Sequence, residues 1–306
     1  MERWTTADIP DQTGRRFVVT GANSGIGYAT AEALVAKGAH VVLACRNTGK
    51  AEDAQARIHA SVTSNGDPSG TSEIAALDLS DLDSVRAFAA SQAGTPIDTL
   101  INNAGIMAVP HGRSVQGHEL QFATNALGHF LLAALLLPQV GDRVVWVSSS
   151  AHRFGEIDLD DPSFERRRYN PWRAYGQSKL ADLMLAYELQ RRLLSAGSRV
   201  RSMAAHPGYA ATNLQKNHTG TWQDKLMETM NSTRAITQSA AMGALPTLFA
   251  ATVPDLAGGS YIGPGSRMET RGYPRPVGSS ERSHDRATAR ALWGKCEGLT
   301  GQEFTV

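Results

Sequence analysis

The 306-residue chain has only two cysteines, Cys45 and Cys296, so no disulfide framework can stabilise it. Its formal net charge is only +1, which gives no electrostatic case for binding nucleic acid or an anionic membrane surface. The longest apolar run, Phe130–Leu137, is too short to span a bilayer, and Met1–Thr5 lacks the apolar core of a secretory signal. These absences predict a cytoplasmic protein with no membrane span and no nucleic-acid partner.

Short apolar runs alternate along the chain with helical patterns, and hydrophobic residues make up 42% of it, enough for a sizeable core. Several runs are continuous Val, Ile and Leu, as expected of strands covered on both faces. Because parallel neighbours need crossover connections, this alternation predicts a single-domain α/β fold over residues 1–306, a Rossmann-like doubly wound parallel sheet of about seven strands. The predicted strands are Arg16–Thr20, His40–Cys45, Glu73–Leu77, Thr99–Asn102, Arg143–Ser148, Arg199–Ala205 and Ser260–Ile262. The predicted helices are Gly27–Lys37, Thr48–Ser61, Asp83–Ala93, Gly117–Leu137, Tyr175–Ser195, Gln238–Ala251 and Ala287–Cys296.

Two longer segments, His152–Ala174 and Thr212–Thr237, interrupt this alternation, and both contain aromatic residues or Met. In an open parallel sheet the ligand binds at the carboxyl ends of the strands. Long excursions at that end are candidate lids or pocket walls. Their large side chains could equally pack on one another, and the sequence leaves both readings open.

The segment Thr20–Gly27 has glycines at positions 21, 25 and 27, between the apolar run Phe17–Val19 and a helical pattern. Glycine lets the backbone turn tightly and approach a ligand without a Cβ in the way. A helix that begins here presents unpaired N–H groups and a partial positive charge to an anion. The segment therefore indicates a pyrophosphate site. Its spacing differs from G-x-G-x-x-G, and a glycine turn can also serve only to join a strand to a helix.

Tyr175 and Lys179 lie four residues apart at the start of a predicted helix, so both side chains can point into one site. A free tyrosine ionises near pH 10, about three units too high for a base at neutral pH. A fixed ammonium beside it favours the phenolate and lowers its pKa. Such pairs also occur by chance on helix surfaces, so the interpretation depends on what surrounds this one.

Polar residues at the ends of two predicted strands supply that context. The serines of Val147–Ser150 end one strand, and Asn102–Gly105 ends another. Asn125 stands among apolar residues of a predicted helix, where a buried amide needs a hydrogen-bond partner, which could be merely a backbone carbonyl. Since carboxyl ends of parallel strands meet at one edge of the sheet, these groups are predicted to share a site with the Tyr and Lys pair.

In this order, these elements resemble the short-chain dehydrogenase/reductase family over most of the chain, from about Gly14 to Ile262. The motifs that carry the resemblance are Thr20-Gly21-x-x-x-Gly25-x-Gly27, Asp78, Asn102-Asn103-Ala104-Gly105, Asn125, Ser149, Tyr175-x-x-x-Lys179, and Pro207-Gly208 with Thr212. The sequence around Ser149 and Pro207 is similar to the retinol dehydrogenase and WW-domain oxidoreductase branch, in its bacterial form. That branch has a similarly long connection from Ser149 to Tyr175, which implies that His152–Ala174 borders the substrate cleft.

The resemblance implies catalytic roles for four residues. Tyr175 is expected to act as general acid in reduction and general base in oxidation. Lys179 is expected to depress the pKa of that phenol and to hydrogen-bond the nicotinamide ribose. Ser149 is expected to hold the substrate oxygen, with Ser150 as the alternative. Asn125 is expected to position a water that links Lys179 to bulk solvent.

The resemblance also implies a nicotinamide dinucleotide, and the end of the second strand predicts which one. NAD-preferring relatives have an acidic residue there, whereas this chain has Cys45 followed by Arg46. An acid would repel a ribose 2′-phosphate, and Arg46 can bind it through paired charged hydrogen bonds, with Lys50 assisting. NADP(H) is therefore predicted over NAD(H), although Arg46 could be only a surface charge. The predicted cofactor-binding residues are Gly21, Asn23, Ser24, Gly25, Ile26, Gly27, Arg46, Asp78, Leu79, Asn103, Ala104, Gly105, Tyr175, Lys179, Pro207, Gly208 and Thr212, and no metal site is predicted.

Together these expectations describe an NADP(H)-dependent oxidoreductase that transfers a hydride to or from a carbonyl/alcohol group of a lipophilic small molecule. The apolar content of the two excursions favours a lipophilic substrate. The alternative is a catalytically silent dinucleotide-binding regulatory protein, against which the intact Ser149, Tyr175 and Lys179 argue. A sugar-nucleotide epimerase or dehydratase shares the Tyr and Lys but has a different glycine spacing and a larger carboxyl-terminal region. A homo-oligomer stays open, because family members often associate.

Overall fold

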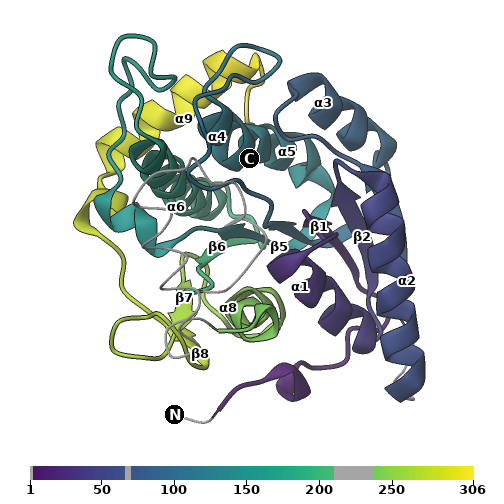
Figure 1. Cartoon of the computed structure of the whole chain (residues 1–306). Coiled ribbons are helices and arrows are strands. Elements are labelled where there is room, and N and C mark those ends of the chain that lie inside the picture. The colour runs from purple at the N-terminus through teal and green to yellow at the C-terminus, as the bar shows by residue number, and fades with distance from the viewer. Residues whose placement is uncertain (1–2, 66–69, 210–237) are drawn as a thin grey trace.

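The computed structural model describes residues 3–65, 70–209 and 238–306. An eight-stranded sheet forms its centre, in the order β3-β2-β1-β4-β5-β6-β7-β8, with helices on both faces (Figure 1). Neighbouring strands are parallel up to β7, and β8 is antiparallel to β7. The strands are β1 Arg16–Thr20, β2 His40–Cys45, β3 Thr71–Ala76, β4 Ile97–Asn102, β5 Val140–Val147, β6 Arg201–Ala205, β7 Tyr261–Pro264 and β8 Pro274–Pro276. The predicted doubly wound sheet is confirmed.

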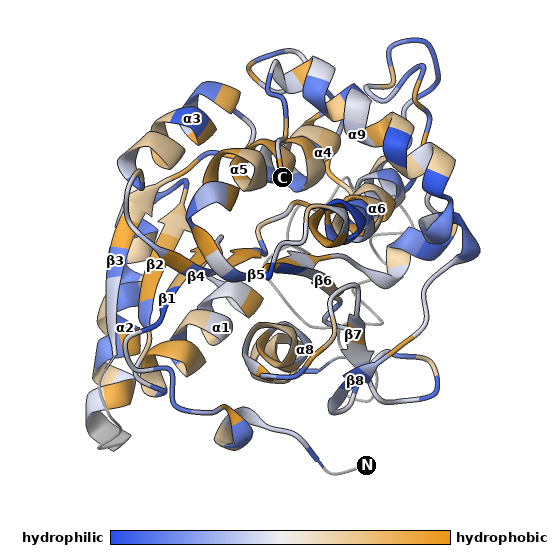
Figure 2. Cartoon of the chain, turned by 180° about the vertical axis from the view of Figure 1, so that it is seen from behind, coloured by the Kyte–Doolittle hydropathy of each residue, from blue (hydrophilic) through white to orange (hydrophobic). Residues whose placement is uncertain are grey.

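The helices α1, α2 and α8 cover one face of the sheet, and α3, α5, α6 and α9 lie on the other (Figure 1). The longer helices are α1 Gly25–Ala36, α2 Thr48–Asn65, α3 Leu82–Ser91, α5 Gly128–Leu136, α6 Pro171–Ser195, α8 Ala240–Thr252 and α9 Arg286–Thr300. Side chains alternate between faces along a strand, so Val18 and Val42 join one apolar cluster while Val19 and Val41 join the other. The inner strands β1, β2 and β4 and the helix α5 are accordingly mostly hydrophobic in Figure 2, whereas the edge strands β3 and β8 are more polar.

Two helices differ from the predicted boundaries in ways that matter for the site. The side chain of Asn170 accepts hydrogen bonds from the backbone of Trp172 and Arg173, so α6 begins at Pro171 rather than at Tyr175. The predicted helix Gly117–Leu137 is instead α4 Leu120–Phe122, a π turn (η2, Ala123–Leu127) and α5.

The strand β8 was not predicted. Its sequence, Pro-Arg-Pro, lacks two backbone donors, which argues against an interior strand. It forms because it lies at the edge of the described sheet, where β7 is the one neighbouring strand among the residues that the structure describes.

One helical stretch among the described residues, Leu120–Gln139, is long and apolar enough by composition to cross a membrane. It is longer than the run Phe130–Leu137 considered from the sequence, because the helix extends toward its N-terminus. The fold buries 83% of its most apolar window, and Phe130, Leu131 and Leu132 have no exposed surface. The stretch therefore serves this fold as a core helix.

Candidate active site

The turn from β1 into α1 has the backbone that its glycines predict. Gly21 and Gly25 have φ of +68° and +56°, a region that favours glycine. A Cβ on Gly27 would lie 2.5 Å from Nδ2 of Asn103 and closer still to the carbonyl oxygen of Gly21. The hydroxyl of Thr20 accepts hydrogen bonds from the backbone N–H groups of Asn103 and Ala104, at 2.9 Å each. The first glycine turn and the end of β4 are thereby tied into one wall.

A cavity of about 390 Å³ opens along this wall. Ser24, the residue before α1, makes no side-chain hydrogen bond to the helix. The backbone N–H groups in the first turn of α1 are therefore not capped by the Ser24 side chain. These groups and the partial positive charge of the helix N-terminus suit a pyrophosphate. The lining residues are Gly21, Asn23, Ser24, Gly25, Ile26, Gly27, Ala44, Arg46, Asn47, Lys50, Leu77, Asp78, Leu79, Asn103, Ala104, Gly105, Ile106, Thr124, Val147, Ser148, Tyr175, Lys179 and Pro207.

The cavity brings together nearly all of the predicted cofactor-binding residues. Gly208 is an exception: it follows the lining residue Pro207 with φ of +66°, and a Cβ there would meet the carbonyl oxygen of Thr270 at 2.5 Å. Thr212, and the whole excursion Thr212–Thr237, lie outside the described residues. The sequence analysis missed the lining residues Ala44, Leu77, Ile106, Thr124 and Val147, although most of them stand at strand ends or beside a recognised motif.

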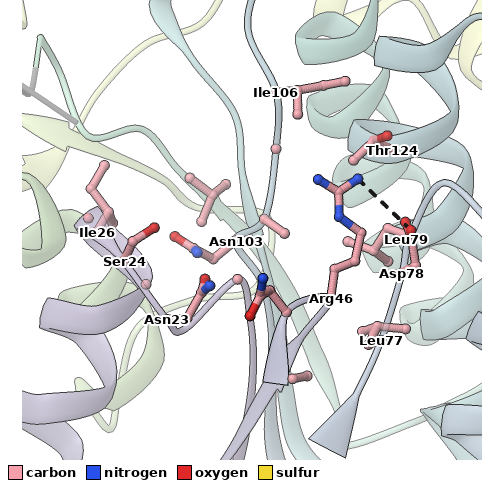
Figure 3. Close-up of a pocket in the computed structure, with 18 of the residues that line it drawn as sticks. Asn23, Ser24, Ile26, Arg46, Leu77, Asp78, Leu79, Asn103, Ile106 and Thr124 are labelled. Atoms are coloured by element: carbon pink, nitrogen blue, oxygen red, sulfur yellow. Dashed lines mark ion pairs between the residues drawn. The ribbon is translucent and has the colours of Figure 1, made fainter. Parts of the chain in front are cut away.

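The part of the cavity predicted to hold the adenosine is lined by residues that follow β2 and β3. In Figure 3, Arg46 reaches across toward Asp78, with 3.9 Å between Nη1 and Oδ2. Asp78 also accepts two hydrogen bonds from Ser80 through Oδ1. Burial raises the pKa of Cys45 to about 11, so its thiol is neutral at pH 7. This position therefore carries no negative charge to oppose a 2′-phosphate.

The three serines after β5 have different surroundings. Ser148 is buried, and its hydroxyl donates to the carbonyl of Lys179 at 2.7 Å. Ser149 is half-buried and is the N-cap of the short helix η4 Ser150–Phe154, where its Oγ accepts a 3.2 Å hydrogen bond from the backbone N–H of Ala151. Accepting that bond leaves its O–H free to donate. Ser150 is exposed. Neither Ser149 nor Ser150 is among the residues that line the described cavity.

Asn125 is fully buried in the π turn, and protein groups occupy its amide. Its Oδ1 accepts from the backbone N–H of Ile106, and its Nδ2 donates to the carbonyl of Ile106 and to Oγ of Ser178. Its own carbonyl accepts from Nδ1 of His129 at 2.7 Å. The side chain thus fastens the loop after β4 to α6, and its predicted role in holding a water stays a prediction.

Tyr175 and Lys179 both line the cavity from α6, as their spacing predicts. The ammonium of Lys179 donates to the carbonyl of Val147 at 2.9 Å and to Oδ2 of Asp182 at 2.8 Å. Sequence reasoning missed Asp182. The signal was present, because residues 175, 179 and 182 follow the i, i+4, i+7 spacing of one helix face.

The excursion His152–Ala174 is largely packed on itself and on its neighbours. Phe164 is 4% exposed and packs edge-on against Tyr169, at 5.5 Å between ring centroids. The hydroxyl of Tyr169 donates to the carbonyl of Val109. Phe154 is different: it is 54% exposed, and its ring covers the backbone of Gly176, next to Tyr175. Phe164 is buried, Tyr169 and Trp172 are half-buried, and Phe154 is exposed. No residue of this segment lines the described cavity, so its predicted role as a lid or pocket wall stays a prediction.

Comparison with known proteins supports the same family as the fold and the sequence motifs do. Residues 15–221 match the family described as short chain dehydrogenase, and the chain belongs to that family of oxidoreductases, which bind a nicotinamide dinucleotide. Within it, the chain is of the retinol dehydrogenase-like branch. It is 37% identical to human retinol dehydrogenase 13 over 97% of this chain and 87% of that protein. It is 37% identical to human WW domain-containing oxidoreductase over 94% of this chain and 69% of that protein.

Two solved structures extend the comparison. A crystallised uncharacterised protein from Mycobacterium paratuberculosis has 46% sequence identity and a TM-score of 0.83, with both chains covered completely. A protein from Beutenbergia cavernae, described as an NAD(P)-dependent gluconate 5-dehydrogenase with NADP bound at low occupancy, has 26% identity and a TM-score of 0.59. The alignment covers 79% of this chain and 92% of that one. The resemblance seen in the sequence motifs is confirmed.

Proposed function

We propose that the protein is an NADP(H)-dependent dehydrogenase/reductase that acts on a carbonyl/alcohol pair of a lipophilic small molecule. One observation carries the proposal. A single cavity is lined by Tyr175 and Lys179, by the uncapped start of α1, and by Arg46 with Lys50. Lys179 contacts the end of β5 and Arg46 follows β2, and these two strands are separated in the sheet by β1 and β4. This order matches the reacting, bridging and adenosine parts of a nicotinamide dinucleotide.

In this proposal the bound nicotinamide supplies or accepts the hydride, and the protein orients it and handles the proton. Tyr175 donates the proton to the carbonyl oxygen in reduction and removes it from the alcohol in oxidation. Ser149 donates its free O–H to the same oxygen and stabilises the charge that develops there. Lys179, held in the cavity wall, binds the ribose and supplies positive charge beside the phenol.

The cofactor preference is supported by charge at the end of β2. Cys45 is neutral, and Arg46 and Lys50 contribute two positive charges against the one carboxylate of Asp78. Arg46 is 72% exposed on its side chain, so it can leave its long contact with Asp78 for a phosphate. The NADP in the Beutenbergia structure is a precedent in a relative of modest identity.

A lipophilic substrate is supported by apolar side chains left in solvent near the reacting end. Phe154 is 54% exposed beside Gly176, and Met268 is 81% exposed. The residue after Met268, Glu269, binds Arg153 and His206 and so ties that loop to η4 and to the turn before Pro207. Homo-oligomerisation and a cytoplasmic location stay predictions.

A screen of long-chain and cyclic aldehydes and ketones, followed by NADPH absorbance, tests the proposal. In parallel, Tyr175→Phe removes only the phenolic O–H. We expect turnover to fall by about 10²-fold or more, the size of a general acid's contribution, while NADPH still binds. Tyr187→Phe, whose phenol contacts Ser279 away from the cavity, is the matched control and should keep full turnover. A wild-type protein that binds NADPH but reduces no carbonyl compound would support the regulatory alternative instead.

A further inference from the structure

Asp182 lies on α6 less than one turn beyond Lys179, on the helix face that Tyr175 also occupies. Its side chain is 2% exposed, and Oδ2 lies 2.8 Å from the ammonium nitrogen of Lys179. The second acceptor of that ammonium is the carbonyl of Val147, at the end of β5, 2.9 Å away. The cation is thus held between a helix side chain and a strand backbone.

An ammonium has three N–H donors, and these two acceptors occupy two of them. The third is left for the cavity. A Cβ placed on the lining residue Gly105 would lie 3.5 Å from Nζ, so the ammonium stands directly at the cavity wall. The contacts with Asp182 and Val147 therefore determine both where the charge of Lys179 sits and how many hydrogen bonds it can give to a ligand.

A carboxylate at this position is costly to the fold. Its Oδ1 is buried and has no hydrogen-bond partner among the described groups. Burial raises the pKa of Asp182 to about 6, against the opposing effect of the Lys179 ammonium. An amide of the same size could still accept a hydrogen bond from Lys179, but it would leave the buried ammonium without an opposing charge. The carboxylate therefore both holds the ammonium and balances its charge.

Other titratable groups that face this pair are neutral. On α5, burial and, to a smaller extent, the charge of Lys179 lower the pKa of His129 to about 3. On α9, burial raises the pKa of Cys296 far above its ordinary value, and Asp182 adds to that rise. Among the described residues, Lys179 is the charged group that acts on Asp182. A change in the protonation of Asp182 therefore changes the net charge of the pair.

We infer that Asp182 is a positioning residue of the active site: it clamps the ammonium of Lys179 at the cavity wall and, through its own charge, sets the positive field that Lys179 exerts on Tyr175. When Asp182 is ionised the pair is neutral, and when it is protonated the site carries a full positive charge. The kinetic consequence rests on the proposed function, whereas the clamp does not.

The kinetic test compares Asp182→Asn with the wild type. Asparagine keeps the size and an acceptor oxygen but removes the charge, so Lys179 acts on the phenol without opposition. We expect the midpoint of the pH profile of kcat/KM for alcohol oxidation to move to lower pH by about one unit, the lower end of the range for one nearby charge. The control is Glu188→Gln, which removes a buried charge from the same helix that is paired with Arg191 and Arg192. Its midpoint should match the wild type. An unmoved midpoint in Asp182→Asn, whatever the change in kcat, overturns the inference.

A second measurement needs no turnover. In protein labelled with ¹⁵N at lysine side chains, the Nζ resonance of Lys179 is assigned by its loss in Lys179→Arg. We expect this resonance to shift with pH around the pKa of Asp182, near 6, in the wild type and in Glu188→Gln, and to stay flat in Asp182→Asn. If the asparagine variant does not fold, the wild-type titration decides alone, and a flat resonance overturns the inference. A wild type that oxidises no alcohol but shows the titration refutes the proposed function and leaves the clamp standing.

Discussion

Arg46 stands just beyond the end of β2, with its guanidinium 3.9 Å from Asp78 and most of its side chain in solvent. A salt bridge this long and this exposed contributes little to stability. A 2′-phosphate would offer the guanidinium two charged hydrogen bonds, which are shorter and stronger. In the proposed function, cofactor choice therefore depends on an arginine that contributes little to the stability of the fold.

Replacing Arg46 by Gln should weaken NADPH binding by about 10- to 100-fold, the loss of charge-assisted hydrogen bonds worth about 1.5–3 kcal/mol. NADH, which lacks the phosphate, should bind about as before. Fluorescence titration with both dinucleotides measures the ratio. Arg57→Gln removes an α2 cation that stacks on Tyr28 rather than lining the cavity, and it should leave the ratio unchanged. Equal losses for NADPH and NADH in Arg46→Gln would mean that Arg46 does not read the phosphate.

At the scale of elements, β1, the glycine turn and α1 act as one unit with the end of β4. The hydroxyl of Thr20 joins Asn103 and Ala104 to β1, and the Asn103 amide donates to the Thr20 carbonyl at 2.8 Å. Gly27 lets α1 approach that junction. This wall of the cavity therefore depends on the close approach of three backbone segments as well as on the glycine conformations.

Gly27→Ala should lower the free energy of unfolding by about 1–3 kcal/mol, as overpacking of a tight core does, and should reduce dinucleotide affinity with it. Gly294→Ala is a matched change within α9, where a Cβ would meet nothing within 4 Å. It should raise stability by about 0.4–1 kcal/mol, because alanine is the better helix former. Urea unfolding monitored by circular dichroism compares the two variants. A Gly27→Ala protein as stable as Gly294→Ala would show that the close approach at Gly21 can relax.

Some elements of this fold can be predicted from residue type alone, and others depend on contacts between elements. The sheet and one wall of the cavity could be predicted from the sequence. Strands buried on both faces require continuous apolar residues, and close approach of two backbones requires glycine. The contact between Asp182 and Lys179 could not be predicted from the sequence. An acidic residue on a long amphipathic helix is equally compatible with an exposed position, and its burial depends on how α9 packs against α6. The strand β8 was missed because its pairing depends on β7, which lies ten residues back, rather than on its own residues.

At the scale of the whole molecule, the core encloses ionisable groups that make its stability depend on pH. Burial lowers the pKa of His129 to about 3 and that of His152 to about 4, whereas it raises that of Asp182 to about 6. The two histidines contribute stability above their unfolded pKa of 6.5 that is lost as pH falls toward their folded values. Asp182 has the opposite sign, because its contribution is lost as pH rises through 6.

Between pH 7 and pH 5 the histidines should each remove about 2 kcal/mol from the free energy of unfolding, and Asp182 should return about 1 kcal/mol. The net expectation is a fall of about 2–3 kcal/mol over that range, measured by urea unfolding at several pH values. His59→Gln, an exposed site, should keep the same slope, and His152→Gln should flatten it. A stability that is level across this range would contradict the neutral, buried state of the two histidines.

The Pro-Arg-Pro strand at the margin of the sheet has a consequence for self-association. The unpaired N–H and C=O groups of an edge strand can hydrogen-bond to a strand of another molecule. Proline has no N–H, so it cannot donate such a hydrogen bond. With Pro274 and Pro276 both facing that margin, growth of the sheet from one copy into the next is disfavoured on this side. Within the described structure, a dimer that extends the sheet would have to pair at the opposite edge, β3, and any other dimer would join through helices or loops.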